Sequence, residues 1–165
     1  METAVAVLEA VGLAAAQLQS ASWPDQIARV LEALGLATRV SRVYIFENHR
    51  SGAVWTTSQT HEWTAPGVAS QIGNPDLTGF DYAANGFQRW ADLLSQGQTV
   101  VGPVRGLPAT ERAVLEPQAI RSIAVVPIFA GSAWWGLIGF DDFGDFLEPP
   151  RDNLGPCRGA RPVVG

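Results

Sequence analysis

The sequence contains no lysine and only one cysteine, and both absences limit what the protein can be. All eleven basic residues are arginine, they form no basic run, and sixteen acidic residues bring the net charge to −5. Such a chain lacks the clustered cations that hold nucleic acid or an anionic membrane, so neither is expected as a main partner. The single Cys157 excludes an intramolecular disulfide and a cysteine-based zinc site, and it fits a reducing cytoplasm.

The sequence also lacks the short motifs of common enzymes. It has no G-x-S-x-G, G-x-x-x-x-G-K-S/T, G-x-G-x-x-G or H-E-x-x-H pattern. Asp141 and Asp142 are neighbours on an expected strand, so their side chains point to opposite faces and cannot act as a carboxylate pair. We expect this strand end to emerge into solvent. Cys157 has no histidine near it in the sequence, so it is not expected to be catalytic, and no metal site is expected.

What the chain does have is a long uncharged run, from Ser122 to Phe140. Nineteen uncharged residues could span a membrane on length alone, but proline and glycine interrupt them and the remaining residues are typical of strands. We predict two antiparallel strands, at about 121–130 and 133–142, joined by a tight turn at Gly131 and Ser132. Strands this apolar on both faces belong at the centre of a covered sheet.

The rest of the chain alternates between helical and strand patterns. Hydrophobic residues make up 47% and charged residues 16%, as in one folded domain, and no basic residue precedes the apolar N-terminus as it would in a signal peptide. A tail at 144–165 with four glycines and four prolines is expected to be poorly ordered. The predicted elements are helices at 3–20, 24–37, 85–96 and 107–119, strands at 42–48, 54–64 and 99–101, and a long loop at 65–85 with at most short helical turns.

Several separated blocks resemble a GAF domain of the type found in bacterial sensor histidine kinases and diguanylate cyclases. They are RVYIFEN at 42–48, HEWTAPG at 61–67, GFQRWADLLSQGQTVVGPV at 86–104, LPATERAVLEPQAI at 107–120, and the SIAVVPIF and WWGLIGFDD strands. The resemblance covers roughly residues 5–142 and implies a GAF domain at 1–143. It implies an α+β, profilin-like fold with a central antiparallel sheet of five to six strands. Helices 3–20 and 24–37 would cover one face, and loop 65–85 with helix 86–96 the other.

Aromatic residues gather around the long loop and the helix after it, as a small-molecule cavity requires. The resemblance implies a ligand in the same place, between the sheet and this loop. An alternative is a second hydrophobic core beneath the loop, and the sequence does not name the ligand. The chromophore-attaching cysteine environment of phytochromes, the cysteine cluster of the free-methionine-sulfoxide reductases and a clear cyclic-nucleotide signature are all absent. The candidate ligand-binding residues are Trp63, Phe80, Tyr82, Phe87 and Trp90, with His61 or Glu62 supplying polarity at the rim.

The resemblance implies a non-catalytic sensory or regulatory domain of a bacterial signal-transduction protein, in the cytoplasm, which shifts attached helices when its state changes. Two alternatives remain open: an enzyme that uses His61 or Glu62 in the loop cavity, and a purely structural dimerisation module. A homodimer is expected. Its interface would be an apolar seam on the first helix, formed by Leu8, Val11, Ala15 and Leu18.

Overall fold

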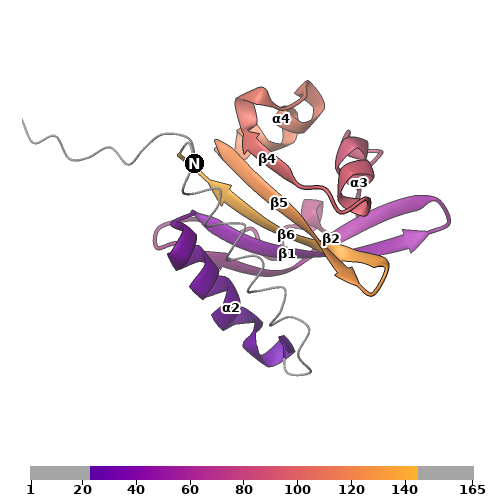
Figure 1. The fold of residues 1–165 in the computed structure, drawn as a ribbon. Helices are drawn as coiled ribbons and strands as arrows, with labels where there is room; N and C mark the ends of the chain where they lie inside the picture. Colours follow the sequence, from indigo (N-terminus) through magenta and orange to yellow (C-terminus); the bar gives the residue numbers. More distant parts are fainter. Residues whose placement is uncertain (1–22, 145–165) are drawn as a thin grey trace, which may run out of the picture.

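The computed structural model describes residues 23–144, which form a six-stranded antiparallel sheet with helices on both faces (Figure 1). The strand order is β3-β2-β1-β6-β5-β4. The predicted α+β fold with five to six strands is therefore confirmed. The elements are α2 (Trp23–Thr38), β1 (Arg42–Ser51), β2 (Val54–Thr64), the 3₁₀ turn η1 (Pro75–Leu77), β3 (Phe80–Asp81), α3 (Gln88–Ser95), β4 (Val100–Pro103), η2 (Val104–Gly106), α4 (Ala109–Leu115), η3 (Glu116–Gln118), β5 (Ser122–Ala130) and β6 (Ala133–Asp142).

The β5–β6 hairpin lies inside the sheet, as its apolar sequence predicts. β6 pairs with β1 on one side and β5 on the other, and β5 pairs in turn with β4. A two-residue turn joins the strands, and Gly131 takes a φ of +61°, a conformation that glycine adopts without steric cost. Because other elements cover both faces, Ile123, Ala124 and Val125 in succession are all buried.

Helix α2 covers one face of the sheet with a regular apolar stripe. Ile27, Leu31 and Leu34 recur at helical spacing and are buried against a cluster that includes Val43 and Ile45 of β1. Gly35 brings the helix backbone close to the Trp63 ring of β2, since a Cβ at Gly35 would lie 2.1 Å from that ring. This face is a filled apolar layer.

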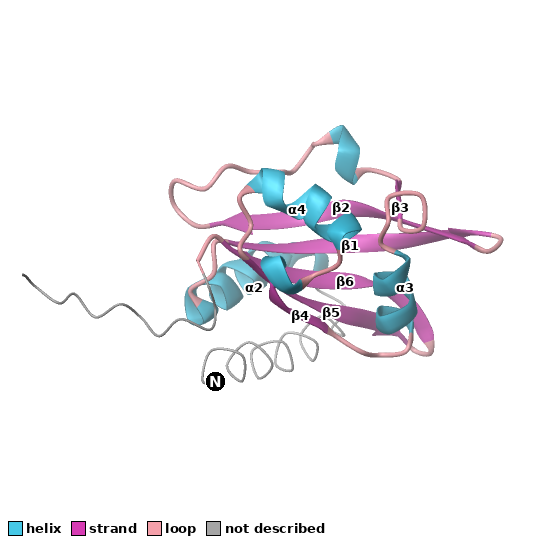
Figure 2. Ribbon diagram, turned by 90° about the horizontal axis from the view of Figure 1, so that it is seen from above, coloured by secondary structure: helices cyan, strands magenta, loops and turns pink. Residues whose placement is uncertain are grey.

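The opposite face carries α3, α4 and the segment that connects β2 to α3 (Figure 2). The predicted division of the elements between the two faces is therefore confirmed for residues 23–144. The expected long loop also contains a two-residue edge strand, β3, which pairs with Thr56 and Thr57. The predicted helix at 3–20, with its dimer seam, and the tail at 145–165 lie outside the described residues.

Candidate functional site

A cavity of about 80 Å³ lies between the sheet and the α3–α4 side of the protein. Its floor comes from β1, β2, β5 and β6, and its roof from α3, α4 and the segment around η1 and β3. The residues that line it are Arg42, Tyr44, Phe46, Thr57, Gln59, Glu62, Gln71, Leu77, Phe80, Tyr82, Phe87, Trp90, Val114, Leu115, Gln118, Ile120, Ile123, Leu137 and Asp141.

Four of the five aromatic residues singled out in the sequence lie together at this cavity. The Phe80 ring packs edge-to-face on Phe87 at 5.3 Å between ring centres, and Phe87 packs in the same way on Trp90 at 4.8 Å. The fourth, Tyr82, is buried and donates a hydrogen bond from its hydroxyl to Asn48 Oδ1 at 2.9 Å. Burial raises the pKa of Tyr82 well above its usual value, so the phenol stays neutral.

A β-bulge in β2 decides which polar side chains reach the cavity. Opposite residues of an antiparallel pair share a face, and Tyr44 lies opposite Glu62 whereas Phe46 lies opposite Gln59. The register shifts between Ile45 and Phe46, which leaves one extra residue in β2. In a regular strand Gln59 and Glu62, which are three positions apart, would point to opposite faces. The bulge puts both on the cavity face, where Gln59 Nε2 donates to Glu62 Oε2 at 3.2 Å.

His61 and Trp63 are the two sequence candidates that are not among the residues lining the cavity. They lie opposite Ile45 and Val43, so they share the face that α2 covers. Trp63 packs on Gly35 of that helix, and burial lowers the pKa of His61. The structure places both side chains away from this cavity and not, as predicted, at its wall and rim. The reason is strand alternation, because the neighbours of Glu62 on a strand must point away from it.

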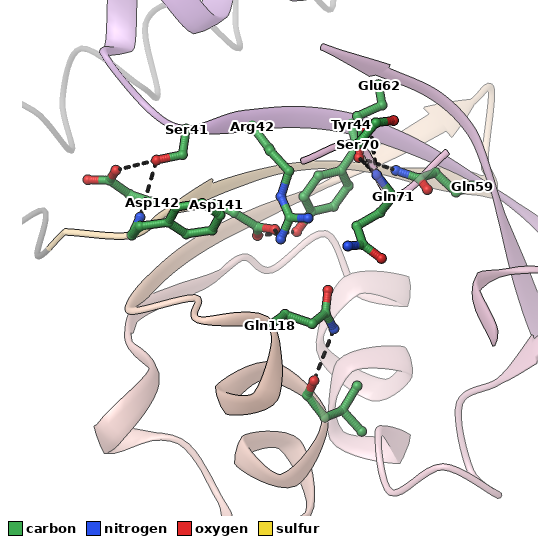
Figure 3. A network of polar contacts seen from close by, with 12 residues as sticks. Ser41, Arg42, Tyr44, Gln59, Glu62, Ser70, Gln71, Gln118, Asp141 and Asp142 are labelled. Carbon is green, nitrogen blue, oxygen red and sulfur yellow. Dashed lines mark hydrogen bonds and ion pairs between the residues drawn. The ribbon is translucent and has the colours of Figure 1, made fainter. Parts of the chain in front are cut away.

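Glu62 holds the segment between β2 and α3 against the sheet through hydrogen bonds. Its carboxylate accepts hydrogen bonds from the Ser70 hydroxyl and from the backbone N–H of Gln71 at 3.0 Å, in addition to the Gln59 amide (Figure 3). Gln71 is thereby held where its side chain lines the cavity. Glu62 thus shapes the site, and both of its oxygens are already occupied by neutral donors.

A buried ion pair closes one end of the cavity. Arg42 Nη2 lies 3.0 Å from Asp141 Oδ2, and the Tyr44 hydroxyl donates to Asp141 Oδ1 at 2.7 Å (Figure 3). Tyr44 lies flat across Gly139, where a Cβ would come within 2.1 Å of its ring. Burial raises the pKa of Asp141 to about 6, although Arg42 and Tyr44 pull it down, and burial likewise raises that of Tyr44.

The expected strand end emerging into solvent is therefore wrong for Asp141, which is only 3% exposed. Asp142 does point the other way, as predicted, and accepts a hydrogen bond from the Ser41 hydroxyl at 3.0 Å. Arg42 was missed as well. The burial of both residues could have been predicted, because each charged side chain shares a strand face with buried apolar residues.

The roof of the cavity is held by a second ion pair, between α3 and α4. Arg89 donates from Nε and Nη2 to the two carboxylate oxygens of Glu111, both at 2.8 Å, and Glu111 is 1% exposed. This two-point contact raises the pKa of Arg89. Thr110 adds a hydrogen bond to the Gly86 carbonyl at 2.9 Å. These contacts connect the two helices above the cavity.

Three buried polar atoms of cavity-lining residues have no hydrogen-bond partner within residues 23–144: Arg42 Nε, Gln59 Oε1 and Trp90 Nε1. Buried polar groups are paired in most proteins, and an unpaired one costs about 1–3 kcal/mol. In the same part of the chain, no group of three or more His, Cys, Asp or Glu is placed to hold a metal ion. The arrangement suits binding of an organic molecule.

The chain is similar to known proteins in sequence. The GAF domain family model matches residues 23–153. A methanogenesis regulatory histidine kinase, FilI of Methanothrix harundinacea, is 44% identical over 113 residues, which are 68% of this chain and 13% of the kinase. The chain thus spans about an eighth of the relative's length.

Solved structures share the fold. The red-light-absorbing state of the cyanobacteriochrome NpR6012g4 superposes with a TM-score of 0.58 at 18% identity, covering 76% of this chain and 80% of that one. The chromophore-binding domain of a bacteriophytochrome from R. palustris gives a TM-score of 0.60 at 12% identity, covering 84% and 53%. At these identities the likeness concerns the fold alone.

None of the helices within residues 23–144 is both long and apolar enough to cross a bilayer. The family model spans most of the chain, and the solved structures named above share its fold. The chain belongs to the GAF domain family.

Proposed function

We propose that this chain is the sensory module of a signal-transduction protein of the histidine-kinase class, and that it binds a small molecule in the cavity under α3 and α4. The observation that carries the proposal is the cavity itself, where aromatic walls meet three buried polar atoms without partners. Unpaired buried polar groups are uncommon in proteins, and three of the five found within residues 23–144 belong to residues that line the cavity.

The position of the Arg42–Asp141 ion pair suggests how ligand binding would affect the segments attached to the domain. Asp141 is the penultimate residue of β6, and the Arg42 guanidinium lies 5.5 Å from the centre of the Phe143 ring, where the described chain leaves the sheet. Ser41, beside Arg42, bonds both Asp142 and the Phe143 N–H. A ligand that favours one arrangement of Arg42 and Asp141 would therefore bias the strand exit as well.

The alternative of an enzyme using His61 or Glu62 in the cavity has less support. His61 does not line the cavity, and both carboxylate oxygens of Glu62 already accept hydrogen bonds from neighbouring residues. The alternative of a purely structural module is opposed by the cavity and its unpaired atoms. Similarity to a histidine kinase favours a kinase output over a cyclase output. A cytoplasmic location stays a prediction.

A thermal-shift screen of small metabolites tests the proposal, because a ligand that binds only the folded state raises its melting temperature. Val114→Phe fills the cavity from α4 and should abolish the shift given by any hit. Val30→Phe makes the same substitution on α2, on the other face, and should keep it. A hit that survives Val114→Phe but is lost in Val30→Phe would place the site elsewhere.

Dimerisation through the first helix also belongs to this proposal. Leu8, Val11, Ala15 and Leu18 lie outside the described residues, and their seam would give an attached helix a partner to move against. Sedimentation of the full chain should show a dimer at micromolar concentration. A monomer under those conditions would remove dimerisation from the proposal without touching the ligand site.

A further inference from the structure

The chemistry of the cavity indicates which class of small molecule binds there. This inference rests on the proposed function, that the cavity binds a ligand. Three features can be considered separately: the volume, the charges and the unpaired polar atoms. Each excludes some candidate ligands, and together they leave one class.

The volume favours a compact molecule. A water molecule needs roughly 10–15 Å³ of such space, so a cavity of about 80 Å³ has room for only a few atoms of that size. Six aromatic rings line this space, and four pairs among them pack edge-to-face. One planar ring with a small substituent fits these walls. The lining rings belong to Tyr44, Phe46, Phe80, Tyr82, Phe87 and Trp90.

The charged groups at the cavity already have partners inside the protein. Three charged residues line it, and Arg42 is paired with Asp141 at 3.0 Å. Glu62 keeps its negative charge, but both of its oxygens accept hydrogen bonds from the neutral donors of Gln59, Ser70 and Gln71. An anionic ligand would have to compete with Asp141 for the guanidinium of Arg42. A cationic ligand would meet that same guanidinium and would have to displace a donor from Glu62. A charged group entering here therefore loses its water and must also break contacts within the protein, which favours an uncharged ligand.

The unpaired atoms supply the complementary pattern. Arg42 Nε and Trp90 Nε1 are donors that seek an acceptor, and Gln59 Oε1 is an acceptor that seeks a donor. The three residues come from β1, α3 and β2, so they line the cavity from its floor and its roof. Arg42 and Trp90 are only 3% and 6% exposed, and both line the cavity. A ligand must therefore offer both a carbonyl-type acceptor and an N–H donor.

We infer that the cavity takes an uncharged, single-ring aromatic molecule that carries an amide or lactam group. Its ring packs among the aromatic walls, its carbonyl oxygen accepts from Trp90 or Arg42, and its N–H donates to Gln59. The unpaired polar atoms are then the recognition elements of the site, and the Arg42–Asp141 pair acts to exclude charged analogues.

Three probes of nearly the same shape test this inference: benzamide is neutral, benzoate is an anion and benzamidine is a cation. Each is titrated into the full 165-residue chain, and its affinity is measured from NMR chemical shifts. Benzamide should bind at least about tenfold more tightly than the other two, because only benzamide offers both groups without a charge. Trp90→Phe should weaken benzamide by about fivefold, the loss of one hydrogen bond.

Matched controls separate recognition from packing. Trp63→Phe makes the same change on the α2 face and should leave benzamide affinity unaltered. Gln59→Glu puts a carboxylate at the acceptor position, so benzamidine should overtake benzamide in that variant, while the same change at exposed Gln98 should have no effect.

Tightest binding of benzoate or of benzamidine by the unaltered protein would overturn the inference, and so would an equal loss in the two tryptophan variants. Failure of all three probes at millimolar concentration would overturn it as well. The metabolite screen then decides the proposed function independently: a different hit, lost in Val114→Phe, would leave the cavity as a ligand site of another class.

Discussion

The two faces of this sheet differ in how they are filled. On the α2 face, helix and strands meet in an apolar layer in which Trp63 occupies the space that Gly35 leaves open. On the α3–α4 face, the layer contains a cavity, a buried ion pair and polar atoms without partners. The first arrangement is optimised for stability alone. The second gives up stability locally, which is the usual property of a binding site.

The largest expected effect comes from breaking the buried ion pair. Arg42→Met leaves the buried Asp141 without its cation, so the carboxyl must either stay charged and unpaired or take up a proton, and the free energy of unfolding should fall by about 3–5 kcal/mol. The double variant Arg42→Met with Asp141→Leu removes both charges and should recover most of that loss. Urea unfolding measures both. A loss below about 1 kcal/mol for the single variant would mean that the pair behaves as an exposed one.

The next effect is a pH dependence that belongs to the cavity face. The pKa of Asp141 is about 6 in the folded protein and about 3.9 when unfolded, so the protonated carboxyl favours folding. This stabilisation is complete below pH 4 and is lost as pH rises through 6, at up to about 1.4 kcal/mol per pH unit.

The control for this pH dependence is Asp141→Asn, which cannot titrate. The free energy of unfolding of the unaltered protein, relative to that of this variant, should fall between pH 4 and pH 6 when measured by urea unfolding. A difference that is flat across this interval, or that rises, would show that the folded carboxyl is not held in a raised-pKa environment.

A smaller effect on stability should distinguish the filled face from the face that contains the cavity. Val43→Leu adds a methylene group to the filled face, where Val43 is fully buried, and should destabilise the protein by about 1–3 kcal/mol. Val114→Leu adds the same group toward the cavity and should be neutral or stabilising by up to about 1 kcal/mol. Thermal unfolding compares them, and equal losses would mean that both faces are equally filled.

The sequence predicts the filled face better than the cavity face. Helical spacing of Ile27, Leu31 and Leu34 identifies the buried stripe of α2, and the uncharged run at 122–140 identifies the central hairpin. Both follow from patterns within one segment. The aromatic cluster of Phe80, Phe87 and Trp90 was also predictable, because these residues are close in the sequence.

The polar part of the site depended on pairings that no local pattern reveals. Asp141 and Arg42 are 99 positions apart and meet only through the β1–β6 pairing. The β2 bulge moves Gln59 to the cavity face, and a bulge has no sequence signature here. The errors at His61 and Trp63 were avoidable, since alternation along β2 separates both from Glu62.

The central claim is that one face of the sheet binds a ligand and the other does not. Methyl NMR spectra of the full chain, recorded with and without the best hit of the metabolite screen, test it most directly. The account predicts shifts for Leu115, Ile120, Ile123 and Leu137, which line the cavity, and unchanged signals for Ile27, Leu31 and Leu34 under α2. Shifts confined to the α2 methyl groups would contradict it.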